Sequence, residues 1–541
     1  MKARHLVRAR RISQAAFLLL FLFLLVESRL PQDVYQNYSL LFSGEADLRL
    51  DYPVTLFFEM DPLISLTSWF SAGALIEGAA WAALILLVTL FLGRFFCGFV
   101  CPFGTLHHVA GGIRPSLTGK KRVQASRTNP LQRVKYFVLI VLVVAAVFGL
   151  NIAGWMDPIS FAFRSIGLAV LPGIGEILKS GFDALARSDI KILNLLSYGG
   201  EILVAPVFGY GHTAYKTAWF IGFLFLAILL LNRIKPRFWC RTLCPLGALL
   251  GLAGRFRTLK LEKDASRCTH CGRCTAACQG AASPEPGLDW QPSECLLCLN
   301  CWETCPEDAL HFRFSWQKPR THPLPDMGRR AVLGGILAGV AIPFLGRLDP
   351  RITGTPDSRL IRPPGSLEEA KFLEVCQRCG LCMKVCPTNA VQPCLGEAGM
   401  AGFWTPHLNM IQGYCEYTCT LCGSVCPTGA IREITSREKT EGPIRIGSAY
   451  LDRGRCLPWS GNGPCIVCQE HCPTSPKAIT LHRETVVGAD GKETAVHLPY
   501  VDLRRCVGCG ICENKCPVRG RPAVRVISAG ETRSLENRIL L

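Results

Sequence analysis

The stretch RFFCGFVCPFG runs from Arg94 to Gly104, and the chain nearly repeats it as RFWCRTLCPLG from Arg237 to Gly247. Six of the eleven positions are identical: the arginine, the phenylalanine, both cysteines, the proline and the glycine. Each copy directly follows a stretch of apolar sequence. This pattern predicts an internal repeat that places two equivalent cysteine loops side by side.

Four apolar runs surround these loops, over residues 12–27, 78–93, 136–155 and 217–232. A membrane-spanning helix needs roughly 20 apolar residues, so the runs predict four membrane helices. The first run is short and follows basic residues, which also suits a signal peptide. No small-residue cleavage site follows it, and we therefore expect an uncleaved helix.

The loop charges predict the orientation. Five Lys or Arg precede residue 12, and residues 94–135 hold eight Lys or Arg and no acid. Residues 30–78 hold seven acids and one Arg. By the positive-inside rule the N-terminus and both cysteine loops face the cytoplasm. The net charge of +18 thus fits a membrane protein, which we expect to lie in a bacterial inner membrane, and we expect no nucleic-acid partner.

The tripeptide MDP occurs twice, at Met60–Pro62 and Met156–Pro158, each between two predicted helices on the outer side. Matching positions in a parallel repeat place Asp61 and Asp157 at outer helix ends, where a carboxylate can accept a quinol proton. A simple helix-ending turn is the alternative, because proline restricts the residue before it.

The repeated loops carry Cys97, Cys101, Cys240 and Cys244. Four converging thiolates suffice for a metal site, which predicts an extra redox centre. A pair of redox-active dithiols and a purely structural role are the alternatives. Each arginine that opens a repeat should stabilise the thiolates, in surroundings that we expect to be electropositive and accessible.

The chain holds 29 cysteines, too many for an ordinary enzyme and in too long a chain for a disulfide scaffold. Two runs with C-x2-C-x2-C-x3-C spacing predict two [4Fe-4S] cubes, in which the fourth cysteine of each run ligates the other cube. Zinc, which favours separate C-x2-C pairs, is the alternative. The expected ligands are Cys268, Cys271, Cys274 and Cys305 for cluster one, and Cys278, Cys295, Cys298 and Cys301 for cluster two. Gln279 stands where a proline usually follows the fourth cysteine.

Four further sets predict four more cubes, six in all. Two sets keep the regular spacing, and two inner sets open with wider spacers. We expect the two outer sets to pair with each other and the two inner sets likewise. The sets are Cys376, Cys379, Cys382 and Cys386; Cys415, Cys419, Cys422 and Cys426; Cys456, Cys465, Cys468 and Cys472; and Cys506, Cys509, Cys512 and Cys516. Cys394 is left over, and a structural or spare thiol is the expected role.

Arg329 and Arg330 precede a short apolar run within residues 326–346. The pair resembles a twin-arginine signal, which predicts a fifth crossing that carries a folded, cluster-bearing domain outward. A core helix is the alternative, since the run is short for a span. The sequence lacks a C-x-x-C-H haem motif, a P-loop and a dinucleotide-binding fingerprint.

Up to about residue 320 the chain resembles the NapH-type membrane ferredoxins, which combine four helices, two CxxxCP motifs and two cubes. From about residue 326 it resembles the NapG-type and MauM-type periplasmic ferredoxins, with a twin-arginine signal and four cube motifs. The fold expected is an α-helical membrane protein, a four-helix parallel repeat plus a fifth helix, with α+β ferredoxin-like domains on both sides. The expected divisions are a membrane domain over 1–255, a cytoplasmic two-cluster domain over 256–320, a transmembrane segment over 326–347 and a periplasmic four-cluster domain over 348–541.

The resemblance implies electron transfer from the membrane quinol pool to a periplasmic reductase or cytochrome, which would make the chain a quinol-oxidising subunit. The alternative is a metallocofactor maturation reductase or a redox-sensing regulatory protein, since related CxxxCP ferredoxins belong to maturation systems. The row of four outer cubes favours electron transfer, because it suits a wire that leads to a receiving partner.

Overall fold

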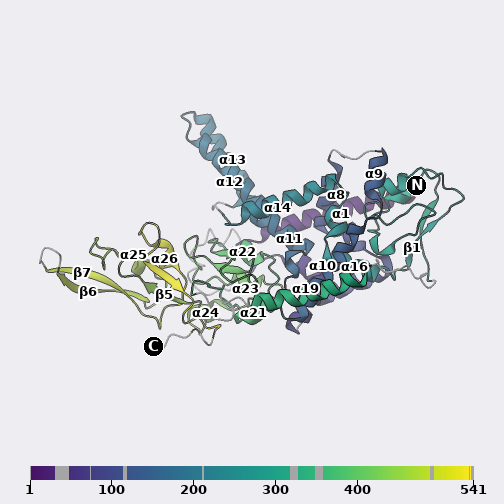
Figure 1. Ribbon diagram of the computed structural model, residues 1–541. Helices are drawn as coiled ribbons and strands as arrows, with labels where there is room; N and C mark the ends of the chain where they lie inside the picture. The colour runs from purple at the N-terminus through teal and green to yellow at the C-terminus, as the bar shows by residue number, and fades with distance from the viewer. Residues whose placement is uncertain are drawn as a thin grey trace. The chain divides into compact units, whose positions relative to one another are not determined.

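The computed structural model describes residues 2–30, 48–73, 75–113, 119–209, 213–316, 327–347, 358–487, 493–534 and 537 (Figure 1). It divides into two compact units, which are treated separately below. Unit 1 comprises residues 1–26, 55–209 and 217–343, and unit 2 comprises residues 27–54, 210–216 and 344–541.

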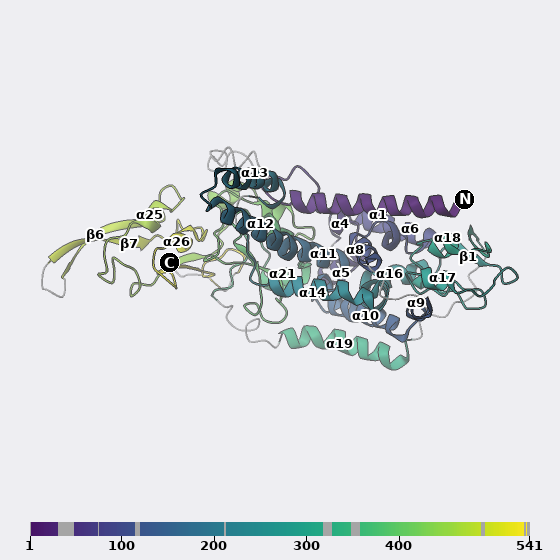
Figure 2. The ribbon, with the colours of Figure 1, turned by 90° about the horizontal axis from the view of Figure 1, so that it is seen from above.

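Unit 1 is mainly helical, and Figure 2 shows α1 as one long helix. The helices of its first repeat are α1 (Lys2–Glu27), α4 (Leu56–Glu59), α5 (Pro62–Ala72), α6 (Ala79–Leu92), α7 (Phe95–Phe99), α8 (Pro102–Gly112) and α9 (Gly119–Ser126). Those of the second repeat are η1 (Pro130–Arg133), α10 (Val134–Val147), η2 (Ala153–Trp155), α11 (Pro158–Ser165), η3 (Ile166–Val170), α12 (Leu171–Ala186), α13 (Lys191–Phe208), α14 (Ala218–Leu230), η4 (Leu231–Arg233), α15 (Phe238–Thr242) and α16 (Pro245–Gly254). The second repeat therefore contains an additional helical hairpin, α12–α13.

Within the described parts of the chain, five helical segments are long and apolar enough to cross a membrane, which indicates a membrane protein: 3–27, 119–147, 158–186, 191–208 and 329–346. Two of these, 158–186 and 191–208, were not among the expected spans. The expected spans at 78–93 and 217–232 form shorter apolar helices instead. Helix α6, with 14 residues, is only about 21 Å long at 1.5 Å per residue. Hydropathy alone missed 158–186 because Arg164 and Pro172 interrupt its apolar sequence, while the helix continues past both.

The two halves of unit 1 pack reciprocally. Helix α8 of the first repeat contacts α11 and α14 of the second, and α16 of the second contacts α5 and α6 of the first. Each MDP separates two short helices, with its aspartate as N-cap and its proline as the first residue of the second helix. Proline suits that position, since its missing N–H has no intrahelical partner there. The MDP sequences thus begin helices as well as ending them.

The cysteine-rich part of unit 1 follows α16. Strands β1 (Leu259–Lys263) and β2 (Leu310–Phe314) pair antiparallel, with Leu261 opposite Phe312. Between them lie α17 (Arg273–Ala277), η5 (Pro292–Glu294) and α18 (Asn300–Thr304), and α19 (Arg329–Arg347) comes after β2. A two-stranded sheet with paired short helices is the α+β arrangement that the sequence predicts for a ferredoxin-like domain.

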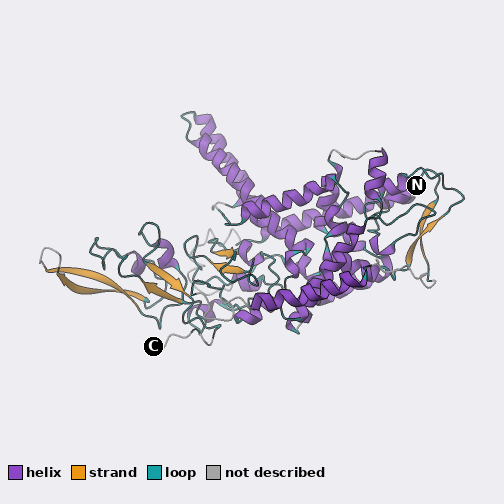
Figure 3. Cartoon of the chain, in the orientation of Figure 1, coloured by secondary structure: helices purple, strands orange, loops and turns teal. Residues whose placement is uncertain are grey.

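Unit 2 is built from short helices and three antiparallel strand pairs, β3–β4, β5–β8 and β6–β7 (Figure 3). Its helices are α21 (Glu369–Val375), α22 (Leu381–Val385), α23 (Leu421–Ser424), α24 (Ser436–Thr440), α25 (Val467–Glu470) and α26 (Ile511–Lys515). Its strands are β3 (Val391–Pro393), β4 (Pro406–Leu408), β5 (Ser448–Leu451), β6 (Ile479–Val487), β7 (Glu493–Val501) and β8 (Val524–Ile527). Cysteines form part of its buried core.

A short piece of the loop before α14 is part of unit 2. The Tyr215 hydroxyl donates to the Met383 carbonyl (3.1 Å), and the Ala214 carbonyl accepts from Asn389 Nδ2 (2.7 Å) and Gln392 Nε2 (3.2 Å). Met383 lies in the helix of the Cys376–Cys386 set, so this loop is anchored directly to a cluster loop.

Candidate iron–sulfur centres

The regular cysteine loops share one backbone conformation. In each loop two residues have positive φ: the residue two positions after the first cysteine, and the residue directly after the second cysteine. These two residues turn the loop back around its sulfurs. These residues are His270 and Gly272, Leu297 and Leu299, Arg378 and Gly380, and Gly508 and Gly510. Residues with side chains rarely adopt this conformation, and it persists only where the surroundings fix it. Backbone N–H groups then point at sulfur, as from His270 to Cys268 Sγ (3.4 Å).

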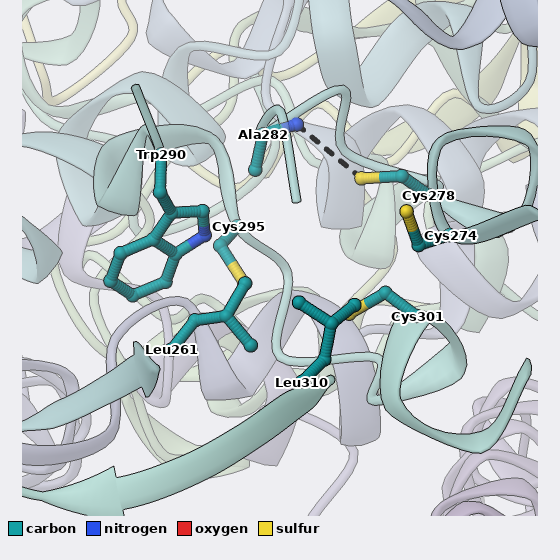
Figure 4. Close-up of a cluster of buried hydrophobic side chains, with 8 residues drawn as sticks. All are labelled: Leu261, Cys274, Cys278, Ala282, Trp290, Cys295, Cys301 and Leu310. Carbon is teal, nitrogen blue, oxygen red and sulfur yellow. Dashed lines mark hydrogen bonds between the residues drawn. The ribbon is translucent and has the colours of Figure 1, made fainter. Parts of the chain in front are cut away.

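The thiols of the two-cluster part group as the expected cross-ligation requires. Four cysteines surround one pocket: Cys268, Cys271, Cys274 and Cys305. The thiol of Cys278 interacts electrostatically with Cys298 and Cys295 of the second run, and Cys301 interacts with those three. Figure 4 shows Cys274, Cys278, Cys295 and Cys301 among buried apolar side chains. Each group offers four thiolates, the ligand set of a [4Fe-4S] cube.

In unit 2 the pairing is between sequence neighbours, which corrects the expected outer-with-outer pairing. Helix α22 contacts α23, and α25 contacts α26. Cys426 lies near Cys376 and Cys382, and Cys386 lies near Cys415. The third and fourth sets exchange in the same way, with Cys516 near Cys456 and Cys472 near Cys506. Neighbouring sets pair because each regular loop needs the fourth cysteine of a second loop, and the adjacent one is closest along the chain.

The two irregular sets differ in their backbone. The residue after their second cysteine has negative φ, −124° at Thr420 and −121° at Ile466. A spacer of three or eight residues lets the chain reach the second cysteine without the left-handed turn that the two-residue spacer imposes.

A backbone contact joins the two cluster pairs of unit 2. The Cys415 N–H donates to the Cys509 carbonyl (2.9 Å), and the two thiols interact electrostatically. Cys415 belongs to the first pair and Cys509 to the second, so the four cysteine groups form one connected series.

The CxxxCP loops come together in unit 1, and their arginines are exchanged. Arg237 Nη1 donates to the Cys97 carbonyl (3.1 Å), and Arg94 Nη2 donates to the Cys240 carbonyl (3.4 Å). A Cβ added to Gly247 would lie 2.5 Å from Arg94 Nη2. Gly247 thus leaves free the space that Arg94 occupies, whereas Arg237 Nη1 would lie 3.6 Å from a Cβ at Gly104, an ordinary contact distance.

The second cysteine of each loop caps the following helix. Cys101 Sγ accepts from the Gly104 N–H (3.4 Å), and Cys244 Sγ accepts from the Gly247 N–H (3.2 Å). The proline after each cysteine is the first residue of that helix. All four thiols are buried, so the expected accessibility is wrong. Arg94 and Arg237 are also buried, 1% and 2% exposed, because each reaches across to the opposite loop instead of to solvent.

The first CxxxCP loop packs directly on the loop of cluster two. A Cβ at Gly98, between Cys97 and Cys101, would lie only 2.3 Å from the Leu296 carbonyl oxygen. Leu296 follows Cys295, so the backbone of the first CxxxCP loop contacts the backbone of the loop of cluster two.

A buried charge network supports this contact. Lys135 Nζ donates to Glu294 Oε2, Arg94 Nη1 lies 3.6 Å from the same oxygen, and the Tyr136 hydroxyl donates to Oε1 (2.9 Å). Burial alone would raise the pKa of Glu294, but Lys135 and Arg94 outweigh it and hold the pKa below its ordinary value. Sequence analysis did not single out Lys135 or Glu294, although Glu294 directly precedes a cluster cysteine.

The structure brings Asp61 and Asp157 into contact. Both are fully buried, and their carboxyl groups lie close enough to interact electrostatically. Asp61 Oδ1 accepts from the Leu63 N–H (2.7 Å) and Asp157 Oδ2 from the Ser160 N–H (2.7 Å). Their other oxygens, Asp61 Oδ2 and Asp157 Oδ1, find no conventional donor. Asp157 also interacts electrostatically with Cys101, so the carboxyl pair neighbours the CxxxCP site.

Comparison with known families covers both kinds of cysteine loop. A family described as a 4Fe-4S binding domain matches residues 75–121, 216–263 and 422–444, which include both CxxxCP loops. A second family of the same description matches 371–392 and 499–519, and a 4Fe-4S dicluster domain matches 260–306. The repeated match in the first half confirms the internal repeat.

Two related proteins match this chain over most of their own length. The ferredoxin-type protein MauM of Paracoccus denitrificans is 35% identical over 203 residues, which are 37% of this chain and 83% of MauM. The ferredoxin-type protein NapG of Escherichia coli is 35% identical over 216 residues, 38% of this chain and 87% of NapG. The chain belongs to the NapG and MauM family of ferredoxin-type proteins. It is accordingly an iron–sulfur protein of electron transfer, as predicted.

A further relative is matched over a smaller share of its own length. YccM of Escherichia coli is 28% identical over 244 residues, which are 44% of this chain, and the chain spans 57% of YccM. No solved structure matches the chain. The expected NapH-type character of the first half stays a prediction.

Proposed function

We propose that this member of the NapG and MauM family oxidises quinol in the membrane and passes the electrons through [4Fe-4S] clusters to a periplasmic reductase or cytochrome. The observation that carries the proposal is the packing of the CxxxCP loops on the loop of cluster two, at Gly98 and Leu296. Electron transfer becomes faster as two redox sites come closer, and this packing brings the CxxxCP loop next to the loop of cluster two.

Six cubes are proposed, held by the 24 cysteines grouped above. Four thiolates per group fit a cube, which would supply one-electron chemistry. In unit 2 the contact of Cys415 with Cys509 orders the four sites as a series. Its far member, proposed at Cys456, Cys465, Cys468 and Cys516, has partly exposed cysteines, which suits delivery to a partner.

The CxxxCP loops are proposed to hold a seventh metal centre. Across the described residues, three metal-ligating atoms come within 4.8 Å of one another only at Cys394, Glu397 and His407. A tetrahedral ion with bonds of about 2.3 Å would hold sulfurs about 3.8 Å apart. The wider spacing of the CxxxCP thiols therefore favours a multinuclear iron–sulfur centre over a single ion. A variant test is direct, since Cys97→Ser and Cys240→Ser should each abolish the centre but leave the six cubes reducible by dithionite.

Asp61 and Asp157 are proposed to take up the quinol protons. Two buried carboxyls in contact cannot both be ionised cheaply, so the pair holds a proton and can exchange it. Their proximity to Cys101 would couple that exchange to the redox site. Asp61→Asn and Asp157→Asn should slow quinol-driven reduction at unchanged iron content, whereas the exposed Asp183→Asn serves as a control.

The proposed topology has the N-terminus and the two-cluster domain in the cytoplasm and residues 348–541 in the periplasm. The domain boundaries proposed from the sequence, at residues 255, 320 and 347, separate the membrane, cytoplasmic and periplasmic parts of this proposed topology. Replacing Arg329 and Arg330 by lysine should leave a C-terminal periplasmic reporter inactive. Normal export of that variant would contradict the twin-arginine interpretation.

The decisive experiment uses the purified protein in proteoliposomes. Adding a quinol analogue should bleach the visible absorbance of the clusters, and an oxidised periplasmic acceptor should restore it. If dithionite reduces the clusters but no quinol does, quinol oxidation is wrong, and the maturation or regulatory role takes its place.

A further inference from the structure

The leftover cysteine of the sequence lies in a compact cluster of three ligand types. Cys394 follows β3, His407 lies in β4, and Glu397 lies in the connection between these antiparallel strands. One ligand atom from each residue lies within 4.8 Å of the other two. Cys394 and His407 are buried, and Glu397 is partly exposed. None of the three belongs to a proposed cube.

The spacing suits a single metal ion. Cys394 Sγ and His407 Nδ1 lie 3.4 Å apart. Two ligands at about 2.3 Å (sulfur) and 2.0–2.1 Å (nitrogen) from a tetrahedral ion lie about 3.5 Å apart. A thiol–imidazole hydrogen bond alone would not require a carboxylate beside both groups, whereas a cation explains all three.

The surrounding groups hold each ligand in place, as metal sites require. Arg362 Nη1 lies 3.5 Å from Cys394 Sγ and also donates to Thr405 Oγ1 (2.8 Å). Its charge is offset by Glu369, which pairs with Nη2 at 2.5 Å. The His407 ring hydrogen-bonds the backbone of Gln392. Glu397 Oε2 accepts from the Leu395 N–H (2.8 Å), which orients the carboxylate.

The protonation states also suit a metal. Burial lowers the pKa of His407 to about 4, so the neutral imidazole offers a lone pair at pH 7. Burial raises the pKa of Cys394 to about 11, so ion binding would release the thiol proton.

The site has room for a further ligand. Glu397 and His407 line a cavity of about 800 Å³, whose wall also includes Lys216, Arg359 and Arg521. Met410 lines the same cavity, and its Sδ packs where a Cβ of Gly510 would lie, beside the cluster ligand Cys509. A coordination position of the metal ion that faces the cavity would thus lie in basic surroundings, next to a cluster loop.

We propose that Cys394, Glu397 and His407 bind one divalent transition-metal ion of the zinc class, with its fourth position open to this cavity. Thiolate and imidazole select borderline and soft metals over magnesium or calcium. The proposal is independent of quinol oxidation, since it concerns a separate site with a separate readout.

The test measures metal content of the cluster-loaded full chain. After incubation with Zn²⁺ and desalting, the wild type should retain about one zinc per chain beyond its cluster iron. Cys394→Ser and His407→Ala should bind zinc at least ~100-fold more weakly, and Glu397→Gln ~10-fold more weakly. The matched control is His482→Ala, a histidine of β6 outside the cluster, which should behave as the wild type.

Cobalt provides a second readout. Co²⁺ should add thiolate-to-cobalt absorbance to the difference spectrum of the wild type and of His482→Ala, but not of Cys394→Ser. If Cys394→Ser loses cluster iron, the partly exposed Glu397→Gln still decides the question. Absence of zinc from the wild type, or equal zinc in all variants, would overturn the proposal.

Discussion

The cube loops and the CxxxCP loops each bring four thiols together, but they do so in different ways. In a regular cube loop three cysteines come from one turn, wrapped by two residues of positive φ, and the fourth comes from a second loop. At the CxxxCP site each loop supplies one cysteine from a short helix, a second cysteine that caps the next helix, and one arginine to the opposite loop. The thiol arrangement of a cube loop is therefore largely local, whereas the CxxxCP site exists only when both repeats are packed together.

The largest effect should come from removing a remote ligand. Cys305→Ser should destroy the cube of Cys268, Cys271 and Cys274, and Cys278→Ser that of Cys295, Cys298 and Cys301. Each should lower the iron content by about four of the about 24 atoms that the six cubes hold, because one ligand position of a cube is lost. Iron and sulfide analysis measures this, with Cys394→Ser as the cysteine control that keeps all cube iron. Equal iron content in all three variants would contradict the ligation of each cube by three cysteines of one run and one cysteine of the other.

Glu294→Gln tests the charge network between the two kinds of loop. It would leave Lys135 and Arg94 buried without a counter-charge, at a cost of about 3–5 kcal/mol. Because the folded pKa of Glu294 is lowered, its stabilisation is present above the unfolded value of about 4.3 and is lost as pH falls toward the folded pKa.

Thermal unfolding of wild type and variant measures this difference at several pH values. The difference should be full at pH 7 and should shrink below about pH 4. The exposed Glu307→Gln should match the wild type throughout. A difference that does not change with pH would mean that Glu294 acts by shape and not by charge.

Gly98→Ala probes the contact between the loops. Its Cβ would approach the Leu296 carbonyl oxygen, a backbone atom that cannot move aside, so we expect a loss of about 1–3 kcal/mol and slower reduction of cluster two. Gly112→Ala is the matched control, because nothing lies within 4 Å of its Cβ. Stopped-flow reduction and thermal unfolding should therefore separate the two variants, and equal behaviour would argue against a tight contact.

The smallest effect should reveal an asymmetry between the repeats. Gly247→Ala would crowd Arg94 Nη2 at 2.5 Å, whereas Gly104→Ala would meet Arg237 Nη1 only at 3.6 Å and the Cys97 carbonyl at 3.0 Å. Because Arg94 is buried and donates to the Cys240 carbonyl, moving its guanidinium would strain that hydrogen bond, and we expect a cost on the order of 1 kcal/mol for Gly247→Ala and less for Gly104→Ala. Comparing their melting temperatures measures this, and the opposite order would contradict the arginine exchange.

The sequence by itself determined the iron–sulfur character, the internal repeat and most of the membrane character. It could do so because cube ligation depends on local spacing, as at Cys268–Cys278, and a membrane helix on a continuous apolar run, as at 12–27. It failed at 158–186, where a helix continues through Arg164 and Pro172, because helix continuity there depends on packing and not on hydropathy.

Only the tertiary structure decided which distant groups meet. The exchange of Arg94 and Arg237 and the contact of Asp61 with Asp157 join residues far apart in the chain, and the pairing of neighbouring cysteine sets in unit 2 joins separate loops. The same holds for Cys394 and His407, which a strand pair brings within 3.4 Å. The physical reason is that local spacing fixes how a loop folds, while the partner of each loop depends on how complete elements pack.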